Sequence, residues 1–313
     1  MLGSPSSPSD YKSGFVAIAG RPNTGKSTFL NQVLGRKVAI VTHKPQTTRT
    51  RILGVLHHPE GQAVFLDTPG IHAPGSSRLN RAMVRTARDA CRDVDLVLFF
   101  VDLPNGFTDD DLKIMNSLPA GKAPIFLVLN KVDRMDRPKL LPILAHMEHH
   151  EHRFAQILPI SALNGDNLAQ LVEQVFRILP LGPPFFPEGQ ISDQPETFIV
   201  AEVVREKLFL ALHQELPYAL GVKVETFEER EDSQGLWDIG AVIMVERESH
   251  KGIVIGKGGS VLKWVGSQAR KELEGLLGLK MHLKLWVRVK SQWRENVTLL
   301  RAMGYPDHLE AGD

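Results

Sequence analysis

The chain has 313 residues, of which 42% are hydrophobic, and its 37 lysines and arginines nearly balance its 36 aspartates and glutamates. This profile is typical of a folded, soluble protein with two domains, and it excludes collagen-like and largely disordered chains. The single cysteine, Cys91, excludes an intramolecular disulfide framework and a four-cysteine zinc site, and it indicates a reducing, cytoplasmic location. Residues 1–13 are predicted to be a disordered leader, and we expect neither a signal peptide nor a membrane anchor, because every apolar run is short.

The near-neutral total hides two segments of opposite charge. Residues 191–250 carry 13 acidic and 5 basic side chains, a net of −8, whereas residues 251–301 carry 11 basic and 3 acidic ones, a net of +8. A basic cluster suits a polyanionic partner, but a solvated helical surface of mixed charge is an equally valid interpretation. Charge alone therefore leaves the question of nucleic-acid binding open.

Short apolar runs alternate with helical periodicity over residues 14–180. Strands are predicted at 14–20, 50–56, 63–67, 94–102, 124–130 and 156–161, and helices at 26–35, 78–91, 108–118, 138–148 and 167–179. Continuous apolar strands between helices indicate an α/β domain with a mostly parallel sheet that helices cover on both faces.

A proline- and glycine-rich stretch, 180-PLGPPFFPEGQ-190, divides the chain, and we assign 181–195 to a linker. Beyond it, 197–212 is expected to begin as an extended or mixed segment and to become an amphipathic helix, followed by a hairpin of strands at 219–229 and 236–246. A glycine turn, a helix over 260–277, a strand over 280–290 and a helix over 293–303 complete a smaller α+β domain at 196–303. Residues 304–313 form a tail.

The segment 20-GRPNTGKS-27 matches the phosphate-loop pattern, with the required strand before it and helix after it. Its glycines allow backbone N–H groups to point at phosphate oxygens, Lys26 neutralises phosphate charge, and Ser27 can ligate magnesium. The predicted nucleotide-binding residues are Gly20, Arg21, Pro22, Asn23, Thr24, Gly25, Lys26, Ser27 and Thr28.

Two further groups of residues follow predicted strands at the edge of the sheet where ligands bind. In 67-DTPG-70, Asp67 can hold magnesium and Gly70 can offer its N–H to a γ-phosphate, with Thr68 and Pro69 between them. In 130-NKVD-133 and 160-ISA-162, the Asp133 carboxylate can accept two N–H donors that guanine presents and adenine lacks. Asn130 would tie loops together, Lys131 would pack along the base, and Ser161 and Ala162 would close the pocket.

These four motifs resemble, in order and spacing, those of the translational-type P-loop GTPases. The resemblance implies binding of GTP or GDP with magnesium, and a switch loop at 45-PQTTR-49 in which one threonine ligates magnesium; we favour Thr48 over Thr47. The predicted metal ligands are thus Ser27, Thr48 and Asp67, and the predicted catalytic residues are Lys26, Thr48, Gly70 and Asn23.

One position departs from the Ras-like pattern, in which a glutamine after DxxG orients the attacking water. Here that residue is Ile71, so we expect slow intrinsic hydrolysis. Asn23 matches the asparagine that helps to bind potassium in related enzymes, although a role in shaping the loop explains it equally well.

In the second domain, 253-IVIGKGGSVLKWVG-266 places a GxxG turn between an apolar, strand-like run and a helix, which resembles the RNA-binding loop of KH domains. Such a loop clamps about four nucleotides through its backbone. The predicted RNA-binding residues are Ile255, Gly256, Lys257, Gly258, Gly259, Lys263, Arg288, Trp293 and Arg294.

A P-loop GTPase domain at 14–180 followed by a KH domain resembles the family of bacterial Era GTPases. That resemblance implies a type II KH fold, binding to the 3′ end of 16S ribosomal RNA, a part in maturation of the 30S subunit, and a cytoplasmic protein that can contact the inner membrane peripherally. No DNA partner is expected. Two alternatives stay open: a GTPase that gates an RNA-modification reaction, and an RNA-binding scaffold in which GTP is structural.

Two other features are given structural explanations. The histidines of 146-HMEHHEH-152 have helical spacing, but no further ligand completes a metal site, so a solvated helix end is preferred. Trp237, Trp264 and Trp286 lie in apolar runs and are predicted to be core, which leaves Trp293 as the tryptophan expected to meet RNA.

Overall fold

The structure is a computed structural model that describes residues 10–71, 77–118, 123–136 and 153–305. Its contacts divide the chain into two compact units, which are described separately. The N-terminal unit comprises residues 1–39, 51–73 and 83–193, and the C-terminal unit comprises 40–50, 74–82 and 194–313. The predicted helix near 138–148 and the histidine cluster at 146–152 lie outside the described residues.

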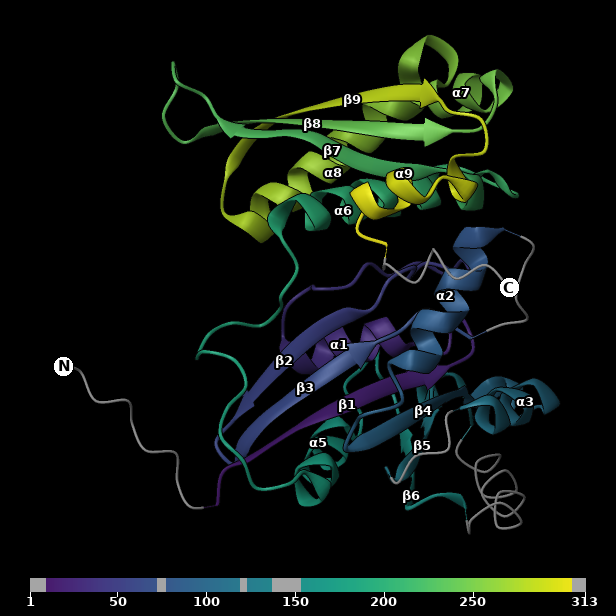
Figure 1. Cartoon of the computed structure of the whole chain (residues 1–313), viewed down its shortest axis with the longest axis vertical. Coiled ribbons are helices and arrows are strands. Elements are labelled where there is room, and N and C mark those ends of the chain that lie inside the picture. Colours follow the sequence, from purple (N-terminus) through teal and green to yellow (C-terminus); the bar gives the residue numbers. More distant parts are fainter. Residues whose placement is uncertain (1–9, 72–76, 119–122, 137–152, 306–313) are drawn as a thin grey trace. The chain divides into compact units, whose positions relative to one another are not determined.

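The N-terminal unit is built on a six-stranded sheet in the order β2-β3-β1-β4-β5-β6 (Figure 1). Strand β2 runs antiparallel to β3, and the other neighbours are parallel, so the predicted mostly parallel sheet is confirmed. Its strands are β1 (Lys12–Gly20), β2 (Ile52–His58), β3 (Gly61–Asp67), β4 (Leu96–Asp102), β5 (Ile125–Asn130) and β6 (Gln156–Ile160).

Helices cover both faces of this sheet because its strands are apolar on both sides. The helices are α1 (Lys26–Leu34), α2 (Arg78–Asp89), α3 (Asp109–Ser117) and α5 (Leu168–Ile178). Phe29 of α1 and Phe176 of α5 pack with Phe100 of β4 in one core, whereas Ile114 of α3 packs with Phe99 in the other. Phe99 and Phe100 thus lie on opposite faces of β4, and both faces are buried, which explains why the sequence of β4 is a continuous apolar run.

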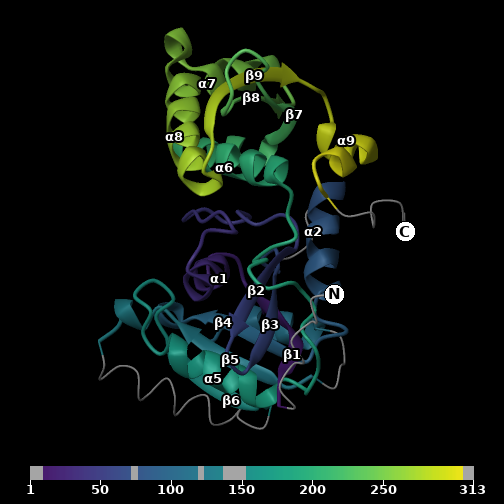
Figure 2. The ribbon, with the colours of Figure 1, turned by 90° about the vertical axis from the view of Figure 1, so that its left-hand side faces the viewer.

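The C-terminal unit carries a three-stranded sheet in the order β7-β8-β9, with β7 antiparallel and β9 parallel to β8. Its elements are α6 (Glu196–Ala211), β7 (Gly221–Glu229), β8 (Leu236–Val245), α7 (Glu248–Ile255), α8 (Ser260–Leu277), β9 (Lys280–Val289) and α9 (Val297–Ala302). This αββααβ order is the one expected of a type II KH fold. Helices α6 and α8 lie on one face of the sheet (Figure 2), where Val204 and Val265 pack with Ala241.

Three local predictions in this unit are wrong. Helix α6 starts at Glu196, directly after Pro195, without a preceding extended segment. The apolar residues 253–255 are the last turn of helix α7, not a strand, and Gly256 ends that helix with a φ of 75°. The final helix is shorter than expected because the Asn296 side chain caps α9 by accepting the backbone N–H of Leu299 at 3.0 Å.

Candidate functional site

The loop between β1 and α1 depends on two glycines. A Cβ at Gly20, where φ is 136°, would lie 2.3 Å from the Phe100 carbonyl oxygen, and one at Gly25, where φ is 94°, would lie 2.1 Å from Nδ2 of Asn130. Asn23 also has a positive φ, of 63°. This backbone, which glycine adopts without strain, curls the chain immediately before the amino end of α1, where anions bind favourably.

Lys26 is the buried cation of this loop, with 5% of its surface exposed. Its Nζ donates to the carbonyl oxygens of Gly20 at 3.2 Å and Arg21 at 2.8 Å. Burial lowers the pKa of Lys26 to about 8, and the charge of Asp67 opposes that shift. A buried ammonium held by two carbonyl dipoles is well suited to an anionic ligand, since a phosphate would restore its preference for the charged form.

A pair of oxygen ligands meets where β3 ends. Ser27 Oγ donates to Asp67 Oδ2 at 2.6 Å, and Asp67 is fully buried. Hydroxyl and carboxylate oxygens are the ligands that Mg²⁺ prefers, so these two predicted residues fit the metal.

The residues after Asp67 pack tightly on the phosphate loop. A Cβ at Gly70 would lie 2.5 Å from the backbone N of Pro22, so no larger residue fits there. The Ile71 N–H donates to the Gly20 carbonyl oxygen at 3.1 Å. The Ile71 side chain is 2% exposed and belongs to the apolar core, which agrees with its having no polar task.

The predicted base-recognition residues are brought together by one side chain, Asn130. Its Nδ2 donates to the Thr24 carbonyl oxygen at 2.8 Å, and its Oδ1 accepts the N–H of Ala162 at 2.9 Å. Ser161 Oγ donates to Asp133 Oδ1 at 2.5 Å, which fixes the carboxylate expected to read guanine. One buried amide thus links the phosphate loop to the loop that would hold the base.

Two carboxylates that the sequence reasoning missed support these residues. Asp102 Oδ2 lies 2.7 Å from the Nζ of Lys131, and the fully buried Asp111 lies 2.7 Å from the Nε of Arg21. Asp102 could have been found, because it ends β4 beside Asn130 at the end of β5. Asp111 also forms a capping box with Thr108, and this pattern signals a helix start and not a site.

The segment expected to be the switch loop groups with the C-terminal unit. Thr47 Oγ1 bonds within the segment, to the Lys44 carbonyl oxygen at 2.8 Å and to Thr42 Oγ1 at 2.6 Å. The Thr48 side chain is buried at 7% exposure. The choice of Thr48 over Thr47 as a magnesium ligand stays a prediction.

Two buried arginines, neither found from the sequence, hold this segment against α6 and the start of β7. Arg205 of α6 donates to the Thr47 carbonyl oxygen, and Arg49 donates to the carbonyl oxygens of Leu220 at 2.7 Å and Pro217 at 3.1 Å. Both guanidinium groups face the Phe209 ring, at 5.3 Å for Arg205 and 5.7 Å for Arg49. Burial lowers the pKa of Arg49. Burial also acts to lower the pKa of Arg205, but Glu202, Tyr305 and Glu206 together raise it.

The turn 256-GKGG-259 connects α7 to α8 and relies on backbone that favours glycine, with φ of 75° at Gly256, 59° at Gly258 and 78° at Gly259. A Cβ at Gly256 would meet Val261 at 2.6 Å, but those at Gly258 and Gly259 would meet nothing within 4 Å. Lys257 is exposed, and Ile255 is half-buried at the end of α7. The loop therefore offers open backbone next to a helix amino end.

A groove of 540 Å³ extends from this loop between α8 and β9. Leu262, Leu283 and Leu285 supply apolar surface, and Lys263 and Arg270 supply charge. The full lining is Gly259, Leu262, Lys263, Gly266, Ser267, Arg270, His282, Leu283 and Leu285. Two predicted residues, Gly259 and Lys263, line it, while Arg270 and His282 were missed because nothing in their spacing brings α8 and β9 together. Apolar surface beside cations suits a nucleic-acid strand.

The tryptophan predictions are mostly wrong. Trp293 is fully buried, and its Nε1 donates to the Ala219 carbonyl oxygen at 3.0 Å, so its side chain is no surface for RNA. Trp264 and Trp286 are instead exposed, at 43% and 45%. Trp237 packs against the core, as expected.

Two predicted RNA-binding cations lie away from the groove, each beside a carboxylate. Arg294 forms two hydrogen bonds with Glu246, at 2.9 and 2.8 Å, and Arg288 lies 2.8 Å from Glu225. Their contact with RNA stays a prediction.

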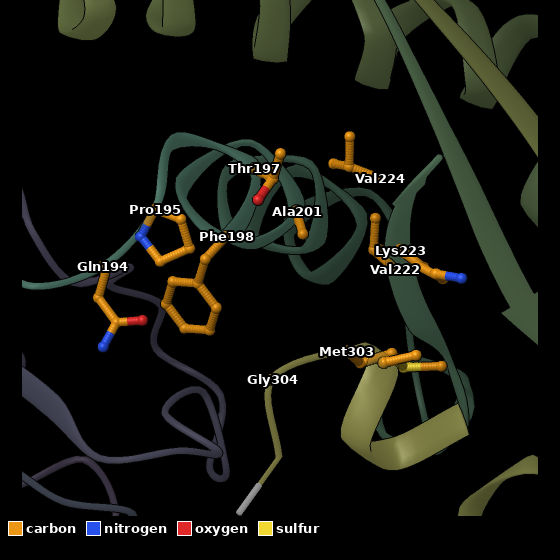
Figure 3. A pocket seen from close by; sticks show the side chains of 11 residues that line it. Gln194, Pro195, Thr197, Phe198, Ala201, Val222, Lys223, Val224, Met303 and Gly304 are labelled. Carbon is orange, nitrogen blue, oxygen red and sulfur yellow. The ribbon is translucent and has the colours of Figure 1, made fainter. Parts of the chain in front are cut away.

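A second hollow, of 230 Å³, lies between the start of α6, β7 and the end of α9 (Figure 3). Phe198, Met303 and the valines of β7 make it largely apolar, with Lys223 at its edge. It is lined by Gln194, Pro195, Thr197, Phe198, Ala201, Val222, Lys223, Val224, Ala302, Met303 and Gly304. None of the predicted site residues lines this hollow.

Among the described residues, no group of three or more histidines, cysteines, aspartates and glutamates is arranged to hold a metal ion. Within the same ranges, no helix combines the length and apolarity needed to cross a bilayer.

The geometry defines the class of protein, a P-loop GTPase joined to a KH domain. A family model described as 50S ribosome-binding GTPase matches residues 15–131, and the KH domain model matches residues 215–294. The chain is therefore a GTP-hydrolysing enzyme with a KH domain.

The chain belongs to the GTPase Era family. It is 49% identical to GTPase Era of Geobacter metallireducens over 295 residues, which cover 94% of this chain and 98% of that protein. It is 45% identical to GTPase Era of Staphylococcus haemolyticus, with 95% and 98% covered. A crystal structure of Era with MgGDPNP and nucleotides 1506-1542 of 16S ribosomal RNA matches with a TM-score of 0.91 at 39% identity, covering 94% of this chain and 99% of that one.

Proposed function

We propose that this protein is a magnesium-dependent GTP switch that binds the 3′ end of 16S ribosomal RNA through its KH domain and assists maturation of the 30S subunit. It would act in the cytoplasm, with the peripheral inner-membrane contact that the family resemblance implies. The observation that carries the GTPase half is the Asn130 bridge between the phosphate loop and the base loop. The groove beside 256-GKGG-259 supports the RNA half.

In this proposal each part of the nucleotide has its own residues. Backbone N–H groups of the loop at 20–28, except at Pro22, and the Lys26 ammonium bind the phosphates, and Asp133 with Ser161 and Ala162 recognises guanine. Ser27 and Asp67, with Thr48 from the switch segment, would hold magnesium, which neutralises phosphate charge when bound. Gly70 would offer its N–H to the γ-phosphate.

Slow hydrolysis follows from the buried, apolar Ile71, because a side chain without a polar atom cannot orient the attacking water. Backbone groups or a potassium ion beside Asn23 would then have to position that water. A comparison of GTP turnover in potassium and in sodium buffer tests the role of Asn23, and equal rates would reject it.

The RNA half is tested with Gly259→Asp and a matched control, Gly235→Asp. Both glycines have a positive φ, of 78° and 81°, and neither would place a Cβ near other atoms, so the two substitutions strain the backbone alike. Only Gly259 lines the groove, where a carboxylate would repel phosphate. We expect Gly259→Asp to weaken binding of a 16S 3′-end oligonucleotide at least tenfold and Gly235→Asp to leave it unchanged, with GDP affinity intact in both.

Equal loss in the two variants would mean that strain and not the loop weakens binding, and the RNA site would be rejected. The switch is tested separately by measuring RNA affinity with GDP and with a non-hydrolysable GTP analogue. Identical affinities would reject the switch and favour a scaffold in which the nucleotide is structural.

A further inference from the structure

Strand β9 has one face in the core and the other in solvent. Met281, Leu283 and Leu285 face α6 and α8, so the alternate residues Lys280, His282, Lys284, Trp286 and Arg288 face away from the helices. This second set carries four basic or ionisable side chains and one indole that is 45% exposed. The face shares His282 with the groove, whose other liners on β9 are Leu283 and Leu285, but Lys284, Trp286 and Arg288 lie outside the groove lining.

The Trp286 ring lies over Gly240 of the neighbouring strand β8. A Cβ at Gly240 of β8 would lie 2.8 Å from ring atom Cζ3 of Trp286 and 3.3 Å from Cβ of Thr226 on β7. Only glycine at position 240 therefore leaves room for the indole to extend over β8. A large aromatic ring that is fixed by its neighbours and still half in solvent is suited to stacking on a base.

Basic residues flank the ring at two-residue spacing along the strand, which separates them by about 6.7 Å. Lys284 precedes Trp286 and Arg288 follows it, with Lys280 further toward the start of β9. The Lys280 side chain has no hydrogen bond or ion pair within the described ranges.

The carboxylates of this face lie on β7 and β8. Asp238 contacts Arg230 at 2.9 Å and His282 at 3.2 Å, and Glu225 contacts Arg288 at 2.8 Å. His282 and Arg288 of β9 thus lie beside carboxylates, and Glu228, opposite Asp238 on β7, is a further exposed carboxylate. The exposed Lys280 and Lys284 supply the remaining positive charge of β9, at the free edge of the sheet. The phosphate groups of an RNA strand would be attracted to this edge.

We propose that the solvent face of β9 is a second RNA-contact surface, on which one unpaired base stacks on Trp286 while Lys284 and Arg288 contact the flanking phosphates. The inference rests on the proposed RNA-binding function and adds to it. RNA is favoured over a lipid surface because the face offers one aromatic ring among charged side chains, whereas membrane insertion needs several adjacent apolar ones.

The test compares two RNA lengths with Trp286→Ala, Trp286→Phe and Lys284→Gln. A tetranucleotide can fill the groove alone, whereas a 16S 3′-end oligonucleotide of about 12 nucleotides can reach β9 as well. We expect Trp286→Ala to weaken the longer RNA about tenfold and the tetranucleotide not at all, and Trp286→Phe to restore most of the affinity. Lys284→Gln should weaken the longer RNA about threefold and reduce its salt dependence. Lys271→Gln, an exposed lysine of α8 outside the groove lining, is the matched charge control.

The outcomes separate the two proposals. If the wild-type chain binds neither RNA, the proposed RNA-binding function itself fails. If it binds both and the β9 variants match the wild type, or if the tetranucleotide is weakened equally, the second surface is rejected. Loss of binding to anionic lipid vesicles by Trp286→Ala, with RNA affinity unchanged, would assign the face to membranes and overturn the proposal.

Discussion

The guanidinium group of Arg205 donates a hydrogen bond to the carbonyl oxygen of Thr47. Arg205 belongs to α6 of the C-terminal unit and is 1% exposed, and its charge is balanced by Glu202 in the preceding turn of the same helix. The same segment is held at Val41, whose N–H donates to Glu206 Oε1 at 2.9 Å. Residues that resemble a GTPase switch are thus bound by α6, the first helix of the C-terminal unit. A change in the conformation of the segment would therefore alter the contacts of α6, and the reverse.

Replacing Arg205 with alanine should destabilise the C-terminal unit by about 3 kcal/mol, because it leaves Glu202 without its buried partner. Urea unfolding followed by tryptophan emission measures this loss, because all four tryptophans of the sequence belong to the C-terminal unit. The segment 40–50 should also become more sensitive to limited proteolysis. Lys113→Ala removes an exposed pair with Asp110 and should cost less than about 0.5 kcal/mol. If both variants unfold at the same urea concentration as the wild type, Arg205 does not anchor the segment.

The lowered pKa of Lys26 predicts a stability that rises at alkaline pH. The pKa is about 8 in the folded chain and 10.5 unfolded. Between these values the unfolded chain binds more protons, so the free energy of unfolding should increase from pH 8 to 10.5, by on the order of 3 kcal/mol in total. Lys26→Met should lack this increase, and the difference between the two pH profiles isolates Lys26 from other titrating groups. Parallel profiles would show that Lys26 is not perturbed.

The same pKa predicts proton uptake when nucleotide binds. Phosphate groups of GDP are fully ionised above pH 8. A phosphate beside Lys26 should therefore raise the pKa of the Lys26 amine, which then takes up a proton from the solvent. Calorimetry of GDP binding at pH 8.5, in two buffers with different heats of ionisation, should show uptake of more than half a proton for each GDP bound. A binding heat that is the same in both buffers would contradict this placement of the phosphate.

Trp293 should act in stability and not in RNA recognition. The ring packs on Gly221, where a Cβ would lie 2.9 Å from it. Trp293→Ala should cost about 3 to 5 kcal/mol. Trp293→Phe should keep most of the packing but lose the hydrogen bond to Ala219, at about 1 to 2 kcal/mol. Thermal unfolding and RNA affinity of the phenylalanine variant decide the matter, since an intact fold with weakened RNA binding would restore the original prediction.

The tryptophans illustrate what the sequence could and could not predict. The strands and helices around the phosphate loop were predictable because short apolar runs, helical periodicity and glycine turns are patterns of residues that are close in sequence. The residues that gather around Asn130 were predictable because they lie at or just after the ends of neighbouring parallel strands. The exposure of Trp286 and the burial of Trp293 depend on Gly240 and Gly221, which are distant in sequence and adjacent only after β7, β8 and β9 pair. Long-range packing of this kind leaves no local pattern, and the same holds for Arg49 and Arg205.

Asn130 should be essential for nucleotide binding although it is placed to organise loops. It is 2% exposed, and its amide satisfies the Thr24 carbonyl oxygen and the Ala162 N–H at once. Asn130→Ala leaves both groups unpaired in a buried place, which costs about 1 to 3 kcal/mol for each. We therefore expect GDP affinity to fall by about 30-fold or more, with RNA affinity of the nucleotide-free chain unchanged. Asn116→Ala, which removes an exposed asparagine bonded to Arg153, is the control and should leave GDP affinity as it was. A GDP affinity within threefold of the wild type in Asn130→Ala would show that the two loops hold their positions without this bridge.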